Sequence, residues 1–336
     1  MNYSKIPEFG ELPLKESDPP LSAWGLWKNP ALGSLNHLHE IKTLEAAKSE
    51  IKTGDRVTLN LPLDAIDPGL LGRQIFQQKV IDKSPSIVND DIITFNTQGS
   101  SQWDGFRHFA YQKEGYFYNG VTQQDIHGKD QPDMNSISAW AKHAIAGRAF
   151  LIDYFDWALE TGKSYDPLAS SPISLSDVQK IIQEKEIRPQ EGDILIIRTG
   201  KSYGDDYIGV IGLTSSSGYI AAYQQADAAT RGSLSSKFEF PGLAQSQETC
   251  EWLWKCQYAA VAADSPAFEC TPPLDFKWAL HPILLAGWGT PIGELFDLES
   301  LAKTCKRLKR WTFFFVSIPL NYTGAVASPP NAMAIF

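Results

Sequence analysis

Apolar residues recur along the chain with two different spacings, and each spacing predicts a different kind of element. In residues 40–53 they recur every three or four positions, which is typical of an amphipathic helix that ends before Gly54. The apolar stripe of this helix consists of Ile41, Leu44, Ala47 and Ile51. Residues 192–199 instead form an almost continuous apolar run, which predicts a strand buried on both faces.

The other periodic segments follow in mixed order, without an internal repeat. Strands are predicted at residues 57–61, 92–98, 149–154, 192–199, 259–263 and 312–319, and helices at 40–53, 136–144, 176–185, 244–255 and 298–307. Residues 1–39 are rich in Pro, Gly and Trp and predict an irregular N-terminal arm, whereas the Ser-rich residues 214–218 predict a surface loop. We therefore expect one α/β domain, residues 40–336, on which the N-terminal arm, residues 1–39, packs.

The composition narrows the classes of partner. The chain has 336 residues, of which 43% are hydrophobic and 21% charged, as in globular proteins that bury a core. A formal net charge of -9 argues against nucleic acid and anionic membranes as partners, because both attract a basic surface. No apolar run approaches the roughly 18 residues of a membrane span, and the first residues show no secretory signal.

The cysteine and tryptophan contents add two expectations. The four cysteines are Cys250, Cys256, Cys270 and Cys305, and their spacing fits no zinc motif. Buried or free thiols indicate a reducing compartment, so we expect a cytoplasmic protein. Ten Trp residues are many for this length, and several are expected to line a pocket or a subunit interface.

The stretch from Thr94 to His108 combines polar and aromatic residues and reads T-F-N-T-Q-G-S-S-Q-W-D-G-F-R-H. Four of its polar residues lie an even number of positions apart: Gln98, Gln102, Asp104 and His108. Side chains alternate between the two faces of an extended backbone, so these four would point to one face. Ten extended residues would span roughly 33 Å, so the segment must bend to form one site. Gly99 and Gly105 permit such a bend. The alternative interpretation is a polar edge strand with an aromatic underside.

Several common catalytic motifs do not occur in the sequence. It contains no G-x-S-x-G elbow, no P-loop and no G-x-G-x-x-G turn, which argues against a hydrolase serine and a nucleotide site of these types. Of the six histidines, His108 and His281 differ from the rest because aromatic or apolar residues surround them. Such a histidine is more often a core residue than a catalyst. Glu294 follows His281 by thirteen residues, and three glycines between them allow a tight return of the chain.

At Gln98, Ser101, Gln102, Asp104 and His108 the chain resembles the metal motif of the putative cyclase family, which includes bacterial kynurenine formamidase and isatin hydrolase. That motif reads His-x-Gly-Thr-His-x-Asp-x-Pro-x-His. The resemblance covers nearly the whole chain, since further segments follow in the family's order: W-G-L-W-K-N-P-A-L-G-S-L-N-H-L, G-D-I-L-I-I-R-T-G, P-G-L, A-A-D-S-P and H-P-I-L-L...P-I-G-E-L-F-D-L. The form with two glutamines, followed by Y-N-G, resembles fungal members. The resemblance implies a single domain of the swivelling β/β/α type, with a mixed sheet and flanking helices.

The chain departs from the family motif at the metal ligands. Gln98 and Gln102 stand where the family has histidines, whereas Asp104 and His108 are unchanged. In the family the first two histidines and the aspartate hold one metal, and the last histidine is the proposed general base. The resemblance therefore implies that the first metal site has lost its two imidazole ligands here.

In the two-metal members of the family, the aspartate also bridges to a second metal held by a later His and Glu, and His281 and Glu294 match these positions. The resemblance implies one divalent metal, Mn, Zn or Mg, held by Asp104, His281 and Glu294. At the first site, the amide oxygens of Gln98 and Gln102 are a poor substitute for imidazole on zinc, although they are tolerable on harder ions such as manganese or magnesium. The alternative is that no metal is bound and the same groups form a hydrogen-bonded acid/base cluster.

Together, these residues and the resemblance predict an enzyme that acts on a small aromatic or polyketide-like molecule. Aromatic residues expected to bind this substrate are Trp24, Trp27, Trp103, Phe106 and Tyr116. His108 is assigned the role of general acid or base, because imidazole exchanges protons near neutral pH. Asp104 would orient it, and the amides of Gln98 and Gln102 would donate hydrogen bonds to a developing oxyanion.

The metal decides which reaction is expected. With a metal, the reaction is hydrolysis of an amide, lactone or formamide. Without one, the same pocket would serve a metal-independent cyclase, dehydratase or isomerase of fungal secondary metabolism. The rival hypothesis is a non-catalytic, metabolite-binding relative, because two ligand histidines are missing. Relatives with this architecture are dimers, so we expect a homodimer with a small-molecule substrate.

Overall fold

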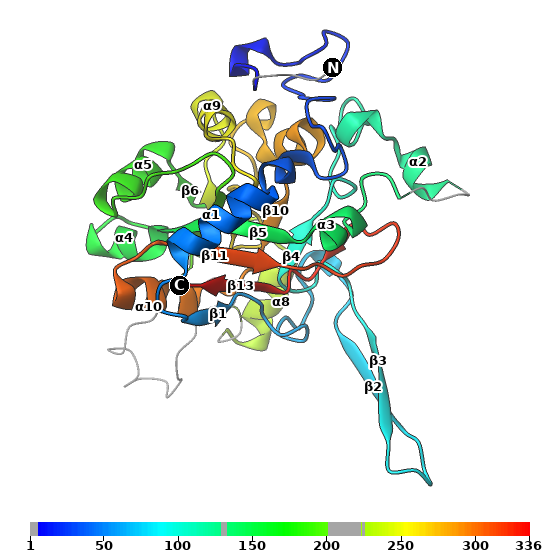
Figure 1. Ribbon diagram of the computed structural model, residues 1–336. Helices are drawn as coiled ribbons and strands as arrows, with labels where there is room; N and C mark the ends of the chain where they lie inside the picture. The colour runs from blue at the N-terminus through cyan, green and yellow to red at the C-terminus, as the bar shows by residue number, and fades with distance from the viewer. Residues whose placement is uncertain (1–5, 129–132, 201–222, 224–225) are drawn as a thin grey trace.

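The computed structural model describes residues 6–128, 133–200, 223 and 226–336, and the loop predicted at 214–218 lies outside these ranges. A nine-stranded sheet forms the centre of the described part of the chain (Figure 1). Its strands, in spatial order, are β1 (Arg56–Thr58), β13 (Ala332–Ile335), β11 (Thr312–Ser317), β5 (Ile145–Asp153), β7 (Ile194–Arg198), β9 (Ala260–Ala263), β10 (Ile292–Glu294), β4 (Gln102–Asp104) and β12 (Ala327–Ser328).

The sheet is mixed. Strands β5, β7, β9 and β10 run parallel to one another, whereas the neighbours on both sides pair antiparallel. Strand β7 is buried at all five positions, as its unbroken apolar run predicts. Helices flank the sheet: α1 (Glu40–Glu50), α2 (Gln123–His127), α3 (Ser138–His143), α4 (Tyr154–Glu160), α5 (Leu175–Glu184), α8 (Ala228–Ser236), α9 (Gln247–Cys256) and α10 (Glu299–Leu308). The predicted class, a single α/β domain with a mixed sheet and flanking helices, is confirmed.

Helix α1 forms where the sequence predicts it, but its predicted orientation is wrong. Ile41 and Leu44, from the expected core stripe, are 65% and 54% exposed. The helix instead buries Glu50, whose carboxylate accepts hydrogen bonds from Arg148, Arg310 and Thr312. A network of hydrogen bonds and ion pairs, rather than apolar burial, therefore holds this helix against β5 and β11.

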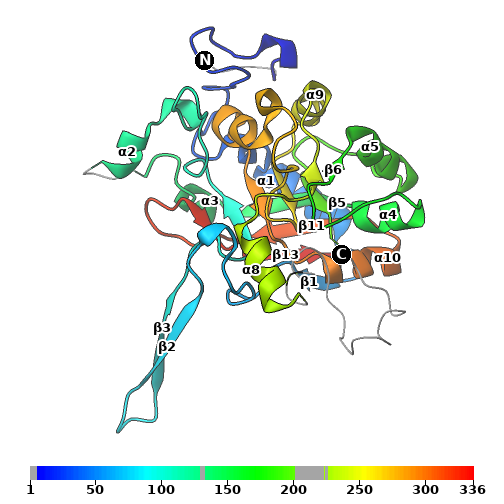
Figure 2. The ribbon, with the colours of Figure 1, turned by 180° about the vertical axis from the view of Figure 1, so that it is seen from behind.

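The strand predicted at 92–98 forms in a different place and is shorter. β3 (Asn89–Thr94) pairs antiparallel with β2 (Gln77–Asp82) in a separate two-stranded hairpin. In both views this hairpin projects from the body of the molecule (Figures 1 and 2). A second small pair, β6 (Pro172–Ile173) and β8 (Gly242–Leu243), is parallel.

The N-terminal residues pack on the core through tryptophan. The indole N–H groups of Trp24 and Trp27 donate to the carbonyls of Ala286 and Trp288, and Trp288 donates back to Leu21. These bonds tie the N-terminal segment to the helical turn Pro282–Trp288. Within the ranges given above, no helix combines the length and apolar character needed to cross a bilayer.

Candidate active site

Strand β4 brings the central polar stretch next to β10. The two strands pair antiparallel with Gln102 opposite Glu294. Opposed residues in such a pair share one face, and alternate residues share it too, so Asp104 lies on the same face as Gln102. Trp103 points to the other side and packs in the core against Phe296.

The backbone bends at both glycines that flank β4. Gly99 closes a turn by donating its N–H to the carbonyl of Asn96. At Gly105 an added Cβ would lie 2.6 Å from the carbonyl oxygen of Val326, so a side chain there would force the backbone to move. These bends bring Gln98 Nε2 to 2.7 Å from Asp104 Oδ1 and 3.1 Å from His108 Nδ1.

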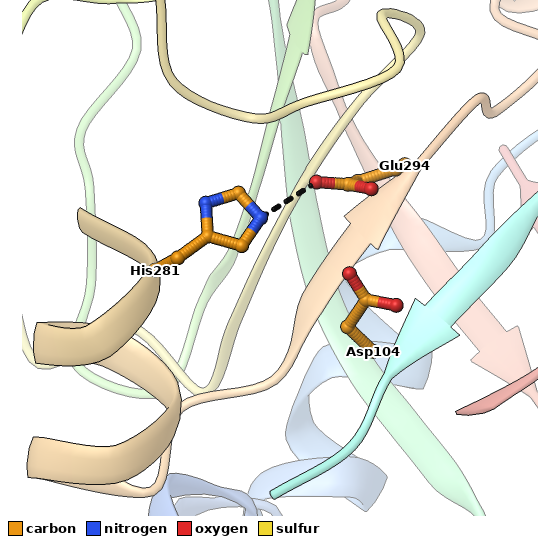
Figure 3. A group of neighbouring side chains, drawn as sticks. All are labelled: Asp104, His281 and Glu294. Atoms are coloured by element: carbon orange, nitrogen blue, oxygen red, sulfur yellow. Dashed lines mark hydrogen bonds and ion pairs between the residues drawn. The ribbon is translucent and has the colours of Figure 1, made fainter. Parts of the chain in front are cut away.

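His281 joins this group from the start of the Pro282–Trp288 turn (Figure 3). Its Nε2 lies 3.0 Å from Oε1 of Glu294, and its Nδ1 lies 2.7 Å from Oε1 of Glu269. Asp104 lies beside the pair, and one ligand atom from each of Asp104, His281 and Glu294 lies within 4.8 Å of the others (Figure 3). The structure thus brings together the four polar residues of the central stretch and the distant His/Glu pair.

Burial controls the protonation of these groups. Burial raises the pKa of Asp104, and its Oδ2 has no hydrogen-bond partner among the described residues. Burial also lowers the pKa of His108, so the imidazole is neutral at pH 7 and can accept a proton. Burial opposes the charge of His281, but the hydrogen bonds that its ring donates to the carboxylates of Glu269 and Glu294 raise its pKa well above the ordinary value.

The residues present fit one divalent cation. Asp104 Oδ2 is a buried carboxylate oxygen without a hydrogen-bond partner in the described structure, and a cation would satisfy it. Two carboxylates and one imidazole form a donor set that Mn²⁺ and Zn²⁺ accept. Glu269 binds the second nitrogen of His281, as carboxylates commonly do behind a metal-ligating histidine. The arrangement therefore has both the ligands and the group that orients one of them.

The two glutamines use their amide nitrogens, not their oxygens, toward the carboxylates. Gln98 Nε2 donates to Asp104, and Gln102 Nε2 donates to Oε2 of Glu294 at 2.7 Å. Oε1 of Gln102 accepts from Nη1 of Arg73 at 3.4 Å, which favours this orientation of the amide. An N–H group cannot ligate a cation, so in this arrangement the glutamines stabilise the carboxylates and provide no first metal site.

The aromatic residues expected to bind substrate lie in several places. Trp103 and Phe106 are fully buried in the hydrophobic core and leave no surface for a ligand. Trp24 packs edge-on against Tyr116, which is 41% exposed, and Trp27 packs against the ring of His37. None of these ring contacts is with a residue of the polar cluster, that is, with Gln98, Gln102, Asp104, His108, His281 or Glu294.

Three residues of the cluster were not found from the sequence. Phe109 lies beside both histidines, with ring centroids 6.1 Å from His108 and 5.6 Å from His281. Glu269 and Arg73 reach the cluster only through the tertiary fold, and nothing in their local sequence marks them. For Phe109, adjacency to His108 was an available signal. A hollow of about 810 Å³ lies elsewhere, between the N-terminal residues and α9.

Comparison with known proteins agrees with this geometry. Residues 35–270 match the family model described as "Putative cyclase". A crystal structure described as a novel cyclase superposes with a TM-score of 0.75 at 27% identity, covering 91% of this chain and 96% of that one. Isatin hydrolase A from Ralstonia solanacearum gives 0.54 at 16% identity, with 88% and 97% coverage.

A further isatin hydrolase structure, bound to the product analogue thioisatinate, superposes with a TM-score of 0.53 at 13% identity and covers 88% of this chain and 96% of that one. At these identities the isatin hydrolases show a shared fold and no more. Among curated proteins, none matches the chain.

Proposed function

Because this chain belongs to the putative cyclase family and is an enzyme of the hydrolase or cyclase type, we propose that it hydrolyses an amide, lactone or formamide bond in a small aromatic or polyketide-like molecule. One observation carries the proposal. Three potential ligands, Asp104, His281 and Glu294, converge around a buried carboxylate oxygen that has no hydrogen-bond partner among the described residues. As part of this proposal, the protein acts in the cytoplasm of a fungal cell, in secondary metabolism.

The cation ligands in this proposal are Asp104, His281 and Glu294. A bound divalent cation would supply Lewis-acid polarisation of the scissile carbonyl and acidify a water molecule. Glu269 fixes the ring of His281 so that Nε2 faces Glu294. Binding of the cation requires Nε2 to be unprotonated, so the cation and a proton compete for this nitrogen.

His108 is the proton carrier in this mechanism. Its side chain is 22% exposed, compared with 13% for His281 and 0% for Asp104, so His108 is more accessible to substrate and water than either of them. The neutral imidazole takes a proton from the attacking water as the new C–O bond forms. It then returns that proton to the departing nitrogen or oxygen. Asp104 Oδ2 lies 3.6 Å from Nε2 and stabilises the imidazolium between these steps.

The remaining neighbours hold these groups in place. Gln98 and Gln102 keep the carboxylates of Asp104 and Glu294 fixed through their amide N–H groups. Phe109 lies against both histidines and offers a ring to a planar substrate. In this proposal Phe109 binds the planar substrate. Sequence analysis predicted that role for Trp103 and Phe106, which are buried.

A second candidate is a metal-independent cyclase, dehydratase or isomerase. The observation that favours it is the pair of amide N–H groups at the positions where the family has imidazole ligands. With His281 as an imidazolium between Glu269 and Glu294, the cluster is hydrogen-bonded without a cation. His108 as base and a protonated Asp104 as acid would then catalyse proton transfer within the substrate.

Metal analysis combined with activity assays separates the candidates. Purified protein is analysed for Mn, Zn and Mg, and hydrolysis of an N-formyl arylamine, isatin and an aromatic lactone is measured before and after EDTA. One ion per chain and chelator-sensitive hydrolysis, restored by the ion, are expected. Turnover that persists in metal-free protein supports the second candidate. Tight binding of such compounds without turnover contradicts both and supports a metabolite-binding protein.

A further inference from the structure

Arg73 brings a positive charge to the edge of the polar cluster. It lies between the short turn Leu70–Gly72 and strand β2. Its Nη1 donates to the backbone carbonyl of Gln98 at 2.7 Å and to Oε1 of Gln102 at 3.4 Å. Both acceptors are neutral oxygens, so these bonds hold the guanidinium in place without neutralising its charge.

The charge of Arg73 has no counter-ion in the described part of the chain. Three other arginines that are at least partly shielded from water each pair with a carboxylate: Arg148, Arg198 and Arg310. Arg73 is half-buried too, but its bonds within the described residues go only to carbonyl oxygens. Shielding a charge from water costs free energy unless the charge is paired. A half-buried guanidinium without a counter-ion therefore favours the binding of an anion.

One edge of the guanidinium is available for that anion. Nε and Nη2 of Arg73 together carry three N–H groups, none of which has an acceptor among the described residues. Neither nitrogen is cut off from solvent. These two nitrogens form one edge of the planar group, and the two oxygens of a carboxylate match that edge with two parallel hydrogen bonds. The free edge is thus suited to a carboxylate in particular.

The backbone before Arg73 is held in an unusual conformation. Leu71 and Gly72 have φ angles of 56° and 70°, and this region is unfavourable for leucine. Such strain persists where the surrounding structure fixes it, and it is concentrated at active sites and ligand clamps. The N–H of Arg73 closes the turn by donating to the carbonyl of Leu70 at 3.1 Å. The turn therefore fixes the point from which the Arg73 side chain extends.

Arg73 is linked directly to the groups that would react. Only the side-chain amide of Gln102 separates its Nη1 from Glu294, because Nε2 of that amide donates to Glu294 at 2.7 Å. The carbonyl that Arg73 binds belongs to Gln98, whose side chain contacts His108. Burial is the main cause of the lowered pKa of His108, and the charge of Arg73 adds to it. One small substrate can therefore reach both Arg73 and the reacting groups.

We propose that Arg73 is the anchor for a carboxylate of the substrate, and that the enzyme selects aromatic compounds with such a group away from the scissile bond. This inference rests on the proposed function, because it concerns the substrate of the same site. Asp104 and Glu294 repel an anionic group, so the scissile end lies toward them and the carboxylate lies on Arg73. The ring between these two ends packs on Phe109.

The alternative role for Arg73 is to brace Gln98 and Gln102. Loss of this bracing would impair every substrate, charged or uncharged, because all of them need the same reacting groups. Loss of an anchor would impair the substrates that carry a carboxylate. The ratio of the two activities therefore distinguishes the anchor from the brace, even where a variant is less active overall.

Matched substrates measure this ratio. The ortho, meta and para isomers of formamidobenzoate are compared with the corresponding formamidobenzamides, which have nearly the same shape without the charge. Wild-type protein is expected to favour the benzoate of at least one pair about 10-fold or more in kcat/KM, mainly through KM. In Arg73→Ala the ratio should fall to about one. Arg188→Ala, at an exposed position, is the matched control and should keep the wild-type ratio.

Binding to metal-free protein provides a readout that does not depend on turnover. After treatment with EDTA no metal is present to hold the carboxylate, so titration calorimetry measures the contribution of Arg73. The benzoate should bind about 10-fold more tightly than its benzamide, and added salt should reduce this difference. Arg73→Ala should abolish the difference. Arg73→Lys should keep part of it, because lysine retains the charge but not the planar edge. Circular dichroism checks the fold of each variant.

The possible outcomes separate this inference from the proposed hydrolysis. No preference for the benzoate in any pair, in rate or in affinity, would overturn the anchor whether or not the compounds are hydrolysed. A preference that Arg73→Ala leaves unchanged would also overturn it and would leave Arg73 as a brace. A preference in binding that depends on Arg73, without hydrolysis of any pair, would support the anchor and contradict the hydrolase.

Discussion

Oε1 of Glu269 accepts a hydrogen bond from Nδ1 of His281 at 2.7 Å and another from the backbone N–H of the same residue, also at 2.7 Å. Its other oxygen accepts from Leu280 N–H and from the amide of Gln245. Four donors thus hold this buried carboxylate, and the carboxylate in turn sets the direction of the imidazole. A group fixed in this way can align Nε2 of His281 with Glu294 and Asp104 before any cation binds.

Glu269→Gln should therefore weaken cation binding without unfolding the protein. Loss of the charge that orients a ligating histidine typically costs 10- to 100-fold in metal affinity, and we expect a loss of that order for Mn²⁺ or Zn²⁺. Titration calorimetry on metal-free protein measures it. Glu251→Gln, at an exposed position on α9, is the matched control. Equal affinities in Glu269→Gln and wild type would show that Glu269 does not orient a ligand.

His108→Ala should abolish most of the turnover and leave the metal content unchanged. Proton transfer by a positioned side chain contributes about 10²- to 10⁴-fold, so kcat should fall by that factor. His127→Ala, at an exposed position on α2, should keep the wild-type rate. Full activity of His108→Ala on any accepted substrate would remove His108 from the mechanism.

Gln98→His combined with Gln102→His should create a further cation site. The change replaces two amide donors that face Asp104 and Glu294 by imidazoles that can ligate. Metal analysis should then give one more ion per chain. Gln77→His/Gln78→His on the exposed strand β2 controls for adventitious binding to added histidines. An unchanged stoichiometry would mean that the two glutamines do not occupy ligand positions.

Glu50→Ala should destabilise the fold although it lies on a helix with an apolar outer face. It would leave Arg148, only 11% exposed, without one of its two carboxylates, and Arg310 and Thr312 without theirs. Breaking such a network by removing one partner costs about 3 kcal/mol of unfolding free energy. Leu44→Ala on the same helix should cost less than about 0.5 kcal/mol, because Leu44 is exposed. Urea unfolding compares the two, and a larger effect of Leu44→Ala would contradict the observed orientation of α1.

Acidification should destabilise the N-terminal segment through His37. Burial lowers the pKa of His37, although Glu191 and Gln257 oppose this effect. The unfolded chain therefore binds a proton at a higher pH than the folded one. Stability is lost as the pH falls from about 6.5 toward the folded pKa, by at most about 1.4 kcal/mol per pH unit. In His37→Gln this part of the slope should vanish, as urea unfolding between pH 5 and 8 would show. The same slope in His37→Gln as in His127→Gln would contradict the assignment.

Local patterns were sufficient for most elements. The run at 192–199 became β7, and the predicted segments at 259–263 and 298–307 became β9 and α10, because period and length depend on neighbours in sequence. The apolar stripe of α1 led to a wrong prediction of the helix orientation, because periodicity shows which side of a helix is apolar but not what packs against that side. Here Arg148, Arg310 and Thr312 lie far along the chain and bind Glu50 instead.

By itself the sequence determined the α/β class, the bend at Gly99 and Gly105, and the set of polar residues that could meet around Asp104. Parity, turn chemistry and motif order all depend on residues close together in the chain. Only the tertiary structure decided that the glutamines donate to carboxylates, that Trp103 faces the core, and that Glu269 orients His281. These contacts depend on strand pairing and packing between distant segments, such as Gln102 and Glu294, which are 192 residues apart, and local spacing does not encode them.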